Sequence, residues 1–248
     1  MFGILRWWRR RSLAERPFPE PWLAILRERV PFFERLSASE RTRFLHQLKI
    51  FVWEKHWIEA GGMEIDDEVR VVVAAAAVRL GIYLDDSIYD RLSEIVMYPS
   101  HYHHPEEESV VFGEAHAWGT VVLSWDAVLG GLSNPSDGHD TATHEFAHVL
   151  DRNTGRFDGT PELRAREDYR QWALVLDHHY QRLRQGKRTE RKVLRMYGAT
   201  NEAEFFAVAT ESFFEKPEQM SEDTPDLYEE LKKFYGFDPA HSAQNNSG

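Results

Sequence analysis

The chain has 248 residues, of which 42% are hydrophobic and 13% aromatic, and this composition excludes intrinsic disorder for the bulk of the chain. Its 41 acidic residues outnumber the 30 basic ones, and the resulting net charge of -11 argues against direct nucleic-acid binding, which needs a basic face. Cysteine is absent, so disulfides and cysteine nucleophiles are excluded and any metal must be held by histidines and carboxylates.

The N-terminal segment, residues 1–19, is basic and aromatic, with Trp7 and Trp8 followed by arginines at positions 9–11. Its charges follow its short apolar part, and no small-residue cleavage site comes after them, so it is not typical of a signal peptide. A loosely held basic end is the simpler interpretation, and a peripheral membrane anchor is the alternative. Because the longest apolar stretch, Val71–Val78, is far shorter than the ~20 residues that span a bilayer, we expect a cytoplasmic protein without a transmembrane segment.

Residues 20–238 have the pattern of one mostly helical α+β domain with a small sheet in its N-terminal part. Ser37 and Glu40 form a capping box that marks the start of a helix. The helices predicted before the sheet are Trp22–Arg29, Ser37–Lys55 and Asp66–Leu80. Runs of β-type residues predict strands at Glu94–Tyr98, Ser109–Phe112 and Thr120–Trp125.

Helical periodicity returns after the predicted sheet. The helices predicted in this half are Thr141–Leu150, Leu163–Arg184, Asn201–Glu215 and Pro225–Tyr235. The last residues, 239–248, have no apolar period and are expected to form a disordered tail.

The segment His144-Glu145-Phe146-Ala147-His148 is an H-E-x-x-H motif on a predicted helix. One helical turn separates the two histidines, so both imidazoles project from one face and can ligate a single zinc ion, with Glu145 beside the open coordination position. The alternative is a pair of surface histidines on an ordinary helix. The other positions of this helix are apolar, however, and unpartnered histidines would be costly in such an environment.

Zinc catalysis needs a third protein ligand. A histidine at the end of H-E-x-x-H-x-x-G-x-x-H is excluded, because Asp151 and Thr154 stand at the positions of the glycine and the last histidine. A glutamate on a later helix is the other solution. Glu204 and Glu211 lie two turns apart on one face of an apolar helix, and the residues alone do not decide between them.

Two segments together, His144–Asp151 and Tyr197–Ala207, resemble the Mlc titration factor A family of bacterial zinc metallopeptidases, whose structural relatives include the anthrax lethal factor catalytic domain. The resemblance extends over most of the chain. It implies a zincin domain of the thermolysin-like (gluzincin) type with the active-site helix beneath the sheet. It also implies that Glu204, in the Ala-Glu-x-Phe-Ala motif, is the third ligand, and that Tyr197 corresponds to a family tyrosine.

These observations predict a zinc-dependent peptidase with one Zn²⁺ per chain, held by His144, His148 and Glu204. Glu145 is the expected general base, and Tyr197 is either a donor to the oxyanion or a core tyrosine. A peptide or protein substrate is expected to pair along the Thr120–Trp125 strand. The residues leave open whether the enzyme is an aminopeptidase or an endopeptidase. The resemblance implies a further partner, a transcriptional repressor of sugar uptake. The alternative function is therefore a regulatory protein that sequesters this repressor, with minor or vestigial peptidase activity.

Other polar residues have weaker claims on function. Asp151 is placed either to accept an N–H from a ligand histidine or simply to end its helix. His178 and His179 are adjacent and point to different helix faces. The segment Gly61–Glu64 is a weak match to a motif of zinc aminopeptidases. A second metal site is disfavoured for His101, His103, His104 and His116, whose spacing follows no helical or tight-turn rule.

Overall fold

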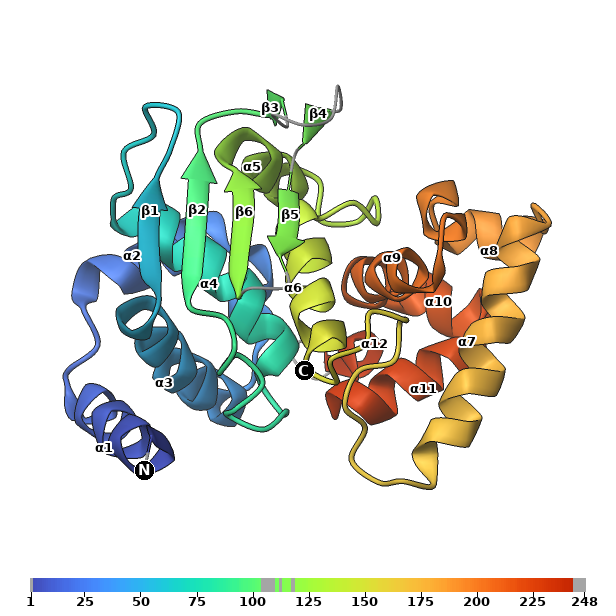
Figure 1. The fold of residues 1–248 in the computed structure, drawn as a ribbon, viewed down its shortest axis with the longest axis horizontal. Helices are drawn as coiled ribbons and strands as arrows, with labels where there is room; N and C mark the ends of the chain where they lie inside the picture. The colour runs from blue at the N-terminus through green and yellow to red at the C-terminus, as the bar shows by residue number, and fades with distance from the viewer. Residues whose placement is uncertain (1, 104–109, 112, 117–118, 243–248) are drawn as a thin grey trace.

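The computed structural model describes residues 2–103, 110–111, 113–116 and 119–242. A four-stranded sheet and the first helices form one side of the molecule, and the helices that follow residue 167 form the other (Figure 1). Buried apolar side chains from Trp22 to Ala240 make one contiguous core across both sides. The chain is thus mostly helical with a small sheet, as the sequence predicts; the boundaries assigned to its domain stay a prediction.

The sheet has the order β1-β2-β6-β5 and is mixed. Its first three strands run parallel and its last pair is antiparallel, with Ile95 of β2 opposite Trp57 of β1 and Val121 of β6. The strands are β1 (His56–Glu59), β2 (Glu94–Tyr98), β5 (Gly113–His116) and β6 (Thr120–Ser124). A separate pair joins β3 (Tyr102–His103) to β4 (Val110–Val111).

Strand β6 is not the free strand that the sequence suggests for peptide binding. It lies between β2 and β5, so the backbone groups on both its sides are already paired. The strand at the edge of the sheet is β5, which pairs with β6 through Glu114 and Val122. This order comes from contacts between distant segments, which the β-propensity of a single segment does not reveal.

The helices of the first half form where their caps predict. The capping box of Ser37 and Glu40 is present, and Asp66 accepts the Val69 N–H at the start of the next helix. These helices are α2 (Glu20–Arg29), the 3₁₀ turn η1 (Pro31–Arg35), α3 (Ala38–Glu54) and α4 (Asp67–Gly81). Helix α4 packs against α2, α3 and α6 and is buried on most of its surface, in line with its Val and Ala content.

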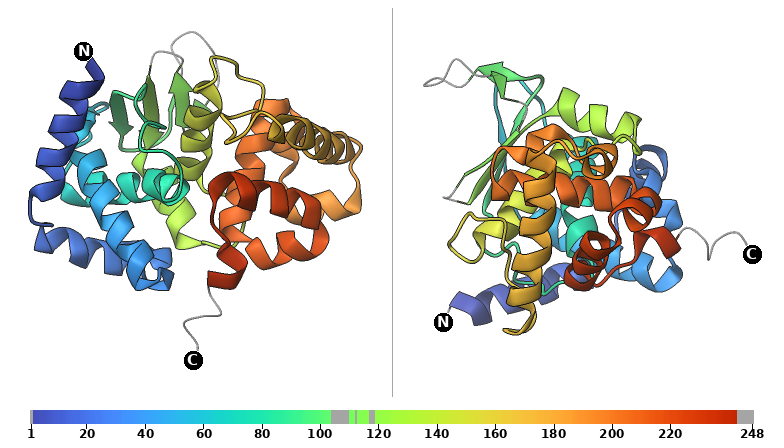
Figure 2. Two further views of the ribbon diagram at one scale, coloured as in Figure 1. Left: turned by 90° about the horizontal axis from the view of Figure 1, so that it is seen from below. Right: turned by 90° about the vertical axis from the view of Figure 1, so that its right-hand side faces the viewer.

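The second half is more broken than the periodicity predicts. Residues 125–242 form α5 (Trp125–Ser133), α6 (Thr141–Arg152), α7 (Asp168–Arg184), α8 (Arg188–Val193), the 3₁₀ turn η2 (Met196–Ala199), α9 (Glu202–Glu215), α10 (Pro217–Asp223), α11 (Pro225–Tyr235) and α12 (Pro239–Ser242). Figures 1 and 2 show α7 to α11 gathered on one side of the molecule, with α6 between them and the sheet.

Several predicted boundaries are wrong for local reasons. Trp125 begins α5 instead of ending a strand, and the helix predicted from Leu163 begins at Asp168. The Leu163 N–H donates to the Tyr169 hydroxyl, and this contact holds the segment before Asp168 outside the helix. The charged residues of this segment do not reveal that contact in the sequence. Of the strand predicted at 109–112, Val110–Val111 form β4, and Ser109 and Phe112 lie outside the described residues. Strand β1 was not predicted, because it follows α3 after a single residue.

Both ends of the chain are more ordered than expected. Residues predicted as a loose basic end form α1 (Phe2–Glu15), with Leu13 buried. The predicted tail begins with α12, where Ala240 is buried and its N–H donates to the Tyr228 hydroxyl; residues 243–248 lie outside the described residues. Within the described ranges, no helix combines the length and apolar character needed to cross a bilayer.

Candidate metal centre

Helix α6 carries the H-E-x-x-H motif through the middle of the molecule, between β5 and α9 (Figure 1). Its N-cap is Asp140, whose carboxylate accepts the Thr143 N–H and hydroxyl. All of its residues from Thr141 to Asp151 are buried, including His144 and His148. The apolar positions anchor the helix in the core, and the two histidines emerge together on one side.

Helix α9 brings a carboxylate to these histidines. Its N-cap Asn201 accepts the Glu204 N–H at 2.9 Å, which places Glu204 in the first turn. Glu204 Oε2 lies 2.9 Å from His144 Nε2 and 3.4 Å from His148 Nε2, and the two Nε2 atoms are 3.1 Å apart. The structure therefore brings His144, His148 and Glu204 into one group that could hold a metal ion.

The tautomer of His144 decides which of its atoms faces this group. His144 Nδ1 lies 2.8 Å from Glu211 Oε1, and a carboxylate only accepts, so Nδ1–H is the donor. Nε2 of the neutral ring then presents a lone pair toward Glu204 Oε2 and His148 Nε2. Acceptor atoms converging in a buried place need a cation between them or a shared proton.

The spacing of the three atoms fits a metal ion. Ligands about 2.0 to 2.2 Å from a tetrahedral ion lie roughly 3.3 to 3.6 Å from one another, and the observed separations of 2.9 to 3.4 Å are equal to this or slightly shorter. Three protein ligands leave a fourth position open, which is the pattern of catalytic and not of structural sites.

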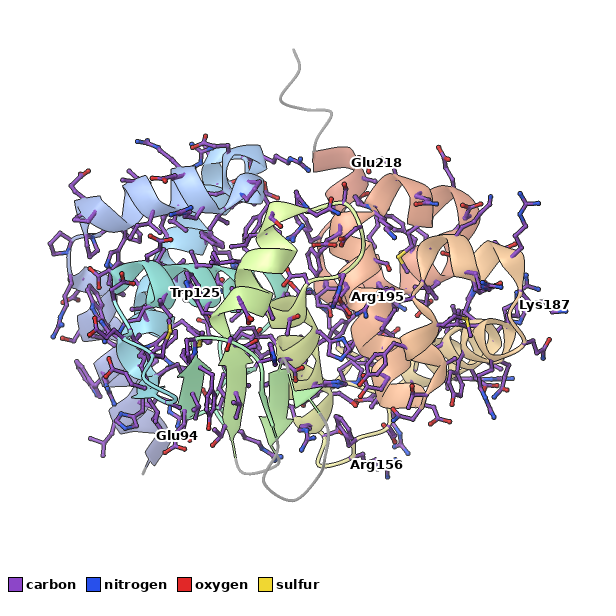
Figure 3. The ribbon with its side chains drawn as sticks, turned by 90° about the horizontal axis from the view of Figure 1, so that it is seen from above. Glu94, Trp125, Arg156, Lys187, Arg195 and Glu218 are labelled. Atoms are coloured by element: carbon purple, nitrogen blue, oxygen red, sulfur yellow. The ribbon has the colours of Figure 1, made fainter. Side chains whose placement is uncertain are left out.

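Glu211 is not part of the group of His144, His148 and Glu204, but it holds His144 in place. It is fully buried, and besides His144 Nδ1 its carboxylate accepts the Asp140 N–H at 2.7 Å and contacts Arg195 Nη2 at 2.5 Å. Arg195 also donates from Nε to the Gly138 carbonyl at 3.0 Å, and Figure 3 shows it among the C-terminal helices. Together these contacts fix the His144 ring and the start of α6.

Glu145, one residue along α6 from His144, lies against β5, and its charge is close enough to raise the pKa of both His144 and Tyr197. It is buried, and a Cβ atom added at Gly113 would come within 2.7 Å of Glu145 Cγ. A side chain at position 113 would therefore occupy the space of the glutamate. Glycine at the start of the edge strand lets this carboxylate lie directly beside the strand.

Two partly exposed aromatic rings flank the histidines. The Tyr197 ring, on η2, is 5.8 Å from the His144 ring, and the Phe157 ring is 5.0 Å from the His148 ring. Both aromatic residues are about half exposed. Burial and the charges of Glu204 and Glu145 raise the pKa of Tyr197, so its hydroxyl keeps its proton and can donate it.

Comparison with known proteins settles the family. The sequence matches the glucose-regulated metallo-peptidase M90 family over residues 5–236. The chain belongs to the glucose-regulated metallo-peptidase M90 family. An uncharacterized protein of Synechocystis is 36% identical, with 96% of this chain and 92% of that protein covered.

Two relatives carry the name that the motifs indicate. Proteins called Mlc titration factor A from Edwardsiella ictaluri and Escherichia fergusonii are 28% and 26% identical to this M90 chain. The alignments cover 95% and 98% of this chain and 94% and 96% of those proteins. The resemblance to the Mlc titration factor A family is thereby confirmed.

Asp151 of the M90 chain does not make the contact considered for it. Its Oδ2 accepts the Gly159 N–H at 3.0 Å, while Asp151 Oδ1 and His148 Nδ1 are both buried without a hydrogen-bond partner among the described residues. Burial raises the pKa of Asp151 to about 6, and the Gly159 N–H opposes this rise. Asp151 thus orders the loop after α6.

The other candidates are not gathered at the centre. His101 lies 3.8 Å from Asp126 Oδ2, His103 and His116 belong to different small strands, and His104 lies outside the described residues. The only metal-type group found among the described residues is His144, His148 and Glu204. The segment Gly61–Glu64 follows β1, at the opposite edge of the sheet from Gly113. His179 is held between Glu190 and Asp226.

Sequence reasoning missed Arg195, Gly113 and Phe157. Arg195 and Gly113 act through contacts with residues far away in the chain, Gly138 and Glu145, and Phe157 reaches His148 only through the turn that follows α6. A single sequence carries no signal for such contacts. The position of Arg195 two residues before Tyr197 was the only pointer toward the site.

The metal-free centre is expected to hold a proton where a metal would bind. Burial lowers the pKa of His144, but hydrogen bonds to Glu204 and Glu211 outweigh it and raise the pKa to about 10. Burial alone raises the pKa of Glu204, yet the two histidines bring it down to about 2. Near pH 7, then, His144 is cationic and Glu204 anionic, and the Nε2 proton lies between the three atoms.

Metal binding should therefore release about one proton per chain near pH 7.5, because a ligand Nε2 must present its lone pair. Below pH 10 the apparent affinity should rise about tenfold per pH unit, since the competing proton becomes scarcer. Calorimetric titrations with Zn²⁺ in two buffers of different ionisation enthalpy measure the proton count. Equal heats in both buffers would show that His144 was already neutral.

Proposed function

We propose that this chain is a zinc-dependent peptidase in which His144, His148 and Glu204 hold one zinc ion. The observation that carries the proposal is the convergence of two Nε2 atoms and a carboxylate oxygen within 3.4 Å of one another in a buried place. Two imidazoles and a carboxylate are a donor set typical of catalytic zinc, and membership in a metallopeptidase family agrees with it. When bound, the ion would supply the Lewis acidity that polarises a scissile carbonyl.

The chain's own residues account for the proton transfers. Glu145 accepts a proton from the attacking water and passes it to the leaving amine. The Tyr197 hydroxyl, which keeps its proton, donates to the oxyanion that develops on the attacked carbonyl. Glu211 and Arg195 keep His144 oriented throughout.

Strand β5 is the proposed partner of an extended peptide substrate. As the edge strand it has one side that pairs with no other strand among the described residues of its sheet, and Gly113 at its start lies against Glu145. A peptide that adds to this edge through backbone hydrogen bonds would pass beside the general base. Backbone pairing tolerates many sequences, so selectivity would depend on side-chain contacts such as those offered by Phe157.

Metal analysis coupled to a peptide-cleavage screen, with and without a chelator, tests this function. We expect one zinc ion per chain, chelator-sensitive cleavage, and loss of zinc in His144→Ala and His148→Ala, since two remaining ligands bind weakly. Stoichiometric zinc in either variant would contradict the assignment of ligands. Cleavage that survives complete removal of the metal would contradict the mechanism.

A methyl group at Gly113 should impair hydrolysis without removing the metal. Gly113→Ala places a Cβ atom 2.7 Å from Glu145 Cγ, so the flexible glutamate side chain must move away. We expect kcat to fall about 10- to 100-fold, because small misplacements of a catalytic group have effects of that size. Gly130→Ala is the matched control, since nothing lies within 4 Å of a Cβ there. Unchanged kcat in Gly113→Ala would show that Glu145 has another productive position.

We also infer a regulatory role through a protein partner, in line with the name Mlc titration factor A of two relatives. The proposed partner is a transcriptional repressor of sugar uptake, met in the cytoplasm. Co-purification of this chain with the Mlc-type repressor from the same cell tests the interaction. If binding is found without any cleavage of peptides, the role as a repressor-sequestering protein becomes the function.

A further inference from the structure

Helix α1 is attached to the rest of the molecule along one side only. Its Leu13 is buried, and it packs against α3. Arg10 Nη2 lies 2.8 Å from Glu54 Oε2 and 2.6 Å from Asp90 Oδ1, and Arg6 Nη1 lies 2.8 Å from Asp90 Oδ2. Two of the four arginines of α1 are thus engaged in holding it to the body of the protein.

The other side of α1 presents large apolar and cationic side chains to solvent. Leu5, Trp7 and Trp8 are 67%, 53% and 60% exposed, although each is a residue type that usually seeks a partner. Arg9 and Arg11 are exposed beside them. The two indole rings contact each other edge to face at 5.1 Å, and the Arg11 guanidinium lies 5.5 Å from the Trp7 ring. We call Leu5, Trp7, Trp8, Arg9 and Arg11 the outer face of α1.

The outer face of α1 lies far from the metal centre. Helix α1 forms one end of the molecule, α8 lies toward the other end, and α6 runs between them (Figures 1 and 2). Its four arginines and single glutamate make α1 cationic, whereas the whole chain has a net charge of -11. A negatively charged surface would therefore attract this end and repel the rest, which would set the orientation of the bound protein.

We propose that the outer face of α1 docks the protein on anionic lipid headgroups. Charge complementarity favours an anionic surface, and tryptophans beside arginines are typical of helices that lie in a membrane interface. Indole rings are favoured at the level of the lipid headgroups, because the apolar part of the ring contacts the acyl chains while its N–H can donate to water or headgroups. The shape also favours lipid: a single helix that projects three large side chains can press into a soft bilayer, while a protein partner would have to offer a matching groove.

Vesicle co-sedimentation with the full chain tests this docking. Vesicles of phosphatidylcholine containing about one third phosphatidylglycerol should bind the protein, pure phosphatidylcholine vesicles should bind it weakly, and added salt should release it. Arg9→Glu with Arg11→Glu should lower partitioning about tenfold or more. Trp7→Ser with Trp8→Ser should lower it to a similar extent, because the apolar contribution is lost. These four residues are exposed, so the fold should survive, as circular dichroism can verify.

A matched charge control separates local docking from overall charge. Lys187→Glu with Arg188→Glu makes the same change in net charge at the opposite end of the molecule, where both residues are exposed (Figure 3). This variant should bind vesicles almost as well as the native protein. An equal loss in both charge variants, or failure of the native protein to bind anionic vesicles at low salt, would overturn the proposal. Quenching of native but not of Trp7→Phe, Trp8→Phe fluorescence by brominated lipid would place the indoles in the interface.

Discussion

Glu204→Gln is expected to lower the zinc affinity of this M90 chain by about 100- to 1,000-fold, a larger loss than Glu211→Gln should cause. Structural zinc sites bind with about 10 to 16 kcal/mol, so one ligand among three or four accounts for several kcal/mol. Glu204 Oε2 faces both Nε2 atoms, at 2.9 and 3.4 Å. A neutral amide in its place offers a weaker ligand atom and no charge.

Glu211→Gln provides the internal comparison for that result. Glu211 accepts a hydrogen bond at the far nitrogen of His144, and loss of such a contact typically weakens metal binding by about 10- to 100-fold. Competition with a fluorescent zinc chelator ranks the two variants on one scale. A greater loss in Glu211→Gln than in Glu204→Gln, or a structure with Glu211 or Asp151 bonded to the metal and Glu204 turned away, would overturn the assignment of the third ligand.

Glu145→Gln should keep the metal and lower peptide hydrolysis by about 100- to 10,000-fold. Glutamine preserves the shape of the side chain beside Gly113 but cannot take a proton from the attacking water. Glu145 is not one of the three residues grouped as proposed ligands, so its charge should not be needed to hold the ion. The kcat of the zinc-loaded variant, measured on a peptide identified in the cleavage screen, gives the size of the effect.

The same variant distinguishes the two proposed roles. If the protein acts by cleaving a target, Glu145→Gln should lose its regulatory effect together with hydrolysis. If it acts by binding a repressor, regulation should persist undiminished in this variant. Hydrolysis that continues at the native rate in Glu145→Gln would show that another group is the base.

Local interactions explain the parts that sequence reasoning predicted well. The capping box of Ser37 and Glu40 forms as expected because both partners lie within one turn. His144 and His148 are four residues apart on a helix, so their approach follows from helix geometry alone. The mostly helical α+β class follows in the same way from the periodicity of successive segments.

Contacts between distant segments decided the rest. Glu204 and Glu211 share one face of α9, and periodicity could not say which of them reaches the histidines. Only the packing of α9 against α6 puts the first carboxylate at the Nε2 atoms and the second at Nδ1 of His144. The chain order of the strands likewise did not reveal that β6 is interior and β5 is the edge.

The N-terminal segment shows the same division. Its tryptophans and arginines are evident in the sequence, but their number does not say which side chains are engaged. Glu54 and Asp90, from two separate parts of the chain, pair with Arg6 and Arg10 and leave Trp8 and Arg9 facing solvent. Sequence by itself determined which helices form and which histidines share a face, because those depend on neighbours within a turn. Tertiary structure decided which glutamate lies beside the two histidines, which strand is the sheet edge and which face of α1 is exposed, because each depends on residues brought together only by folding.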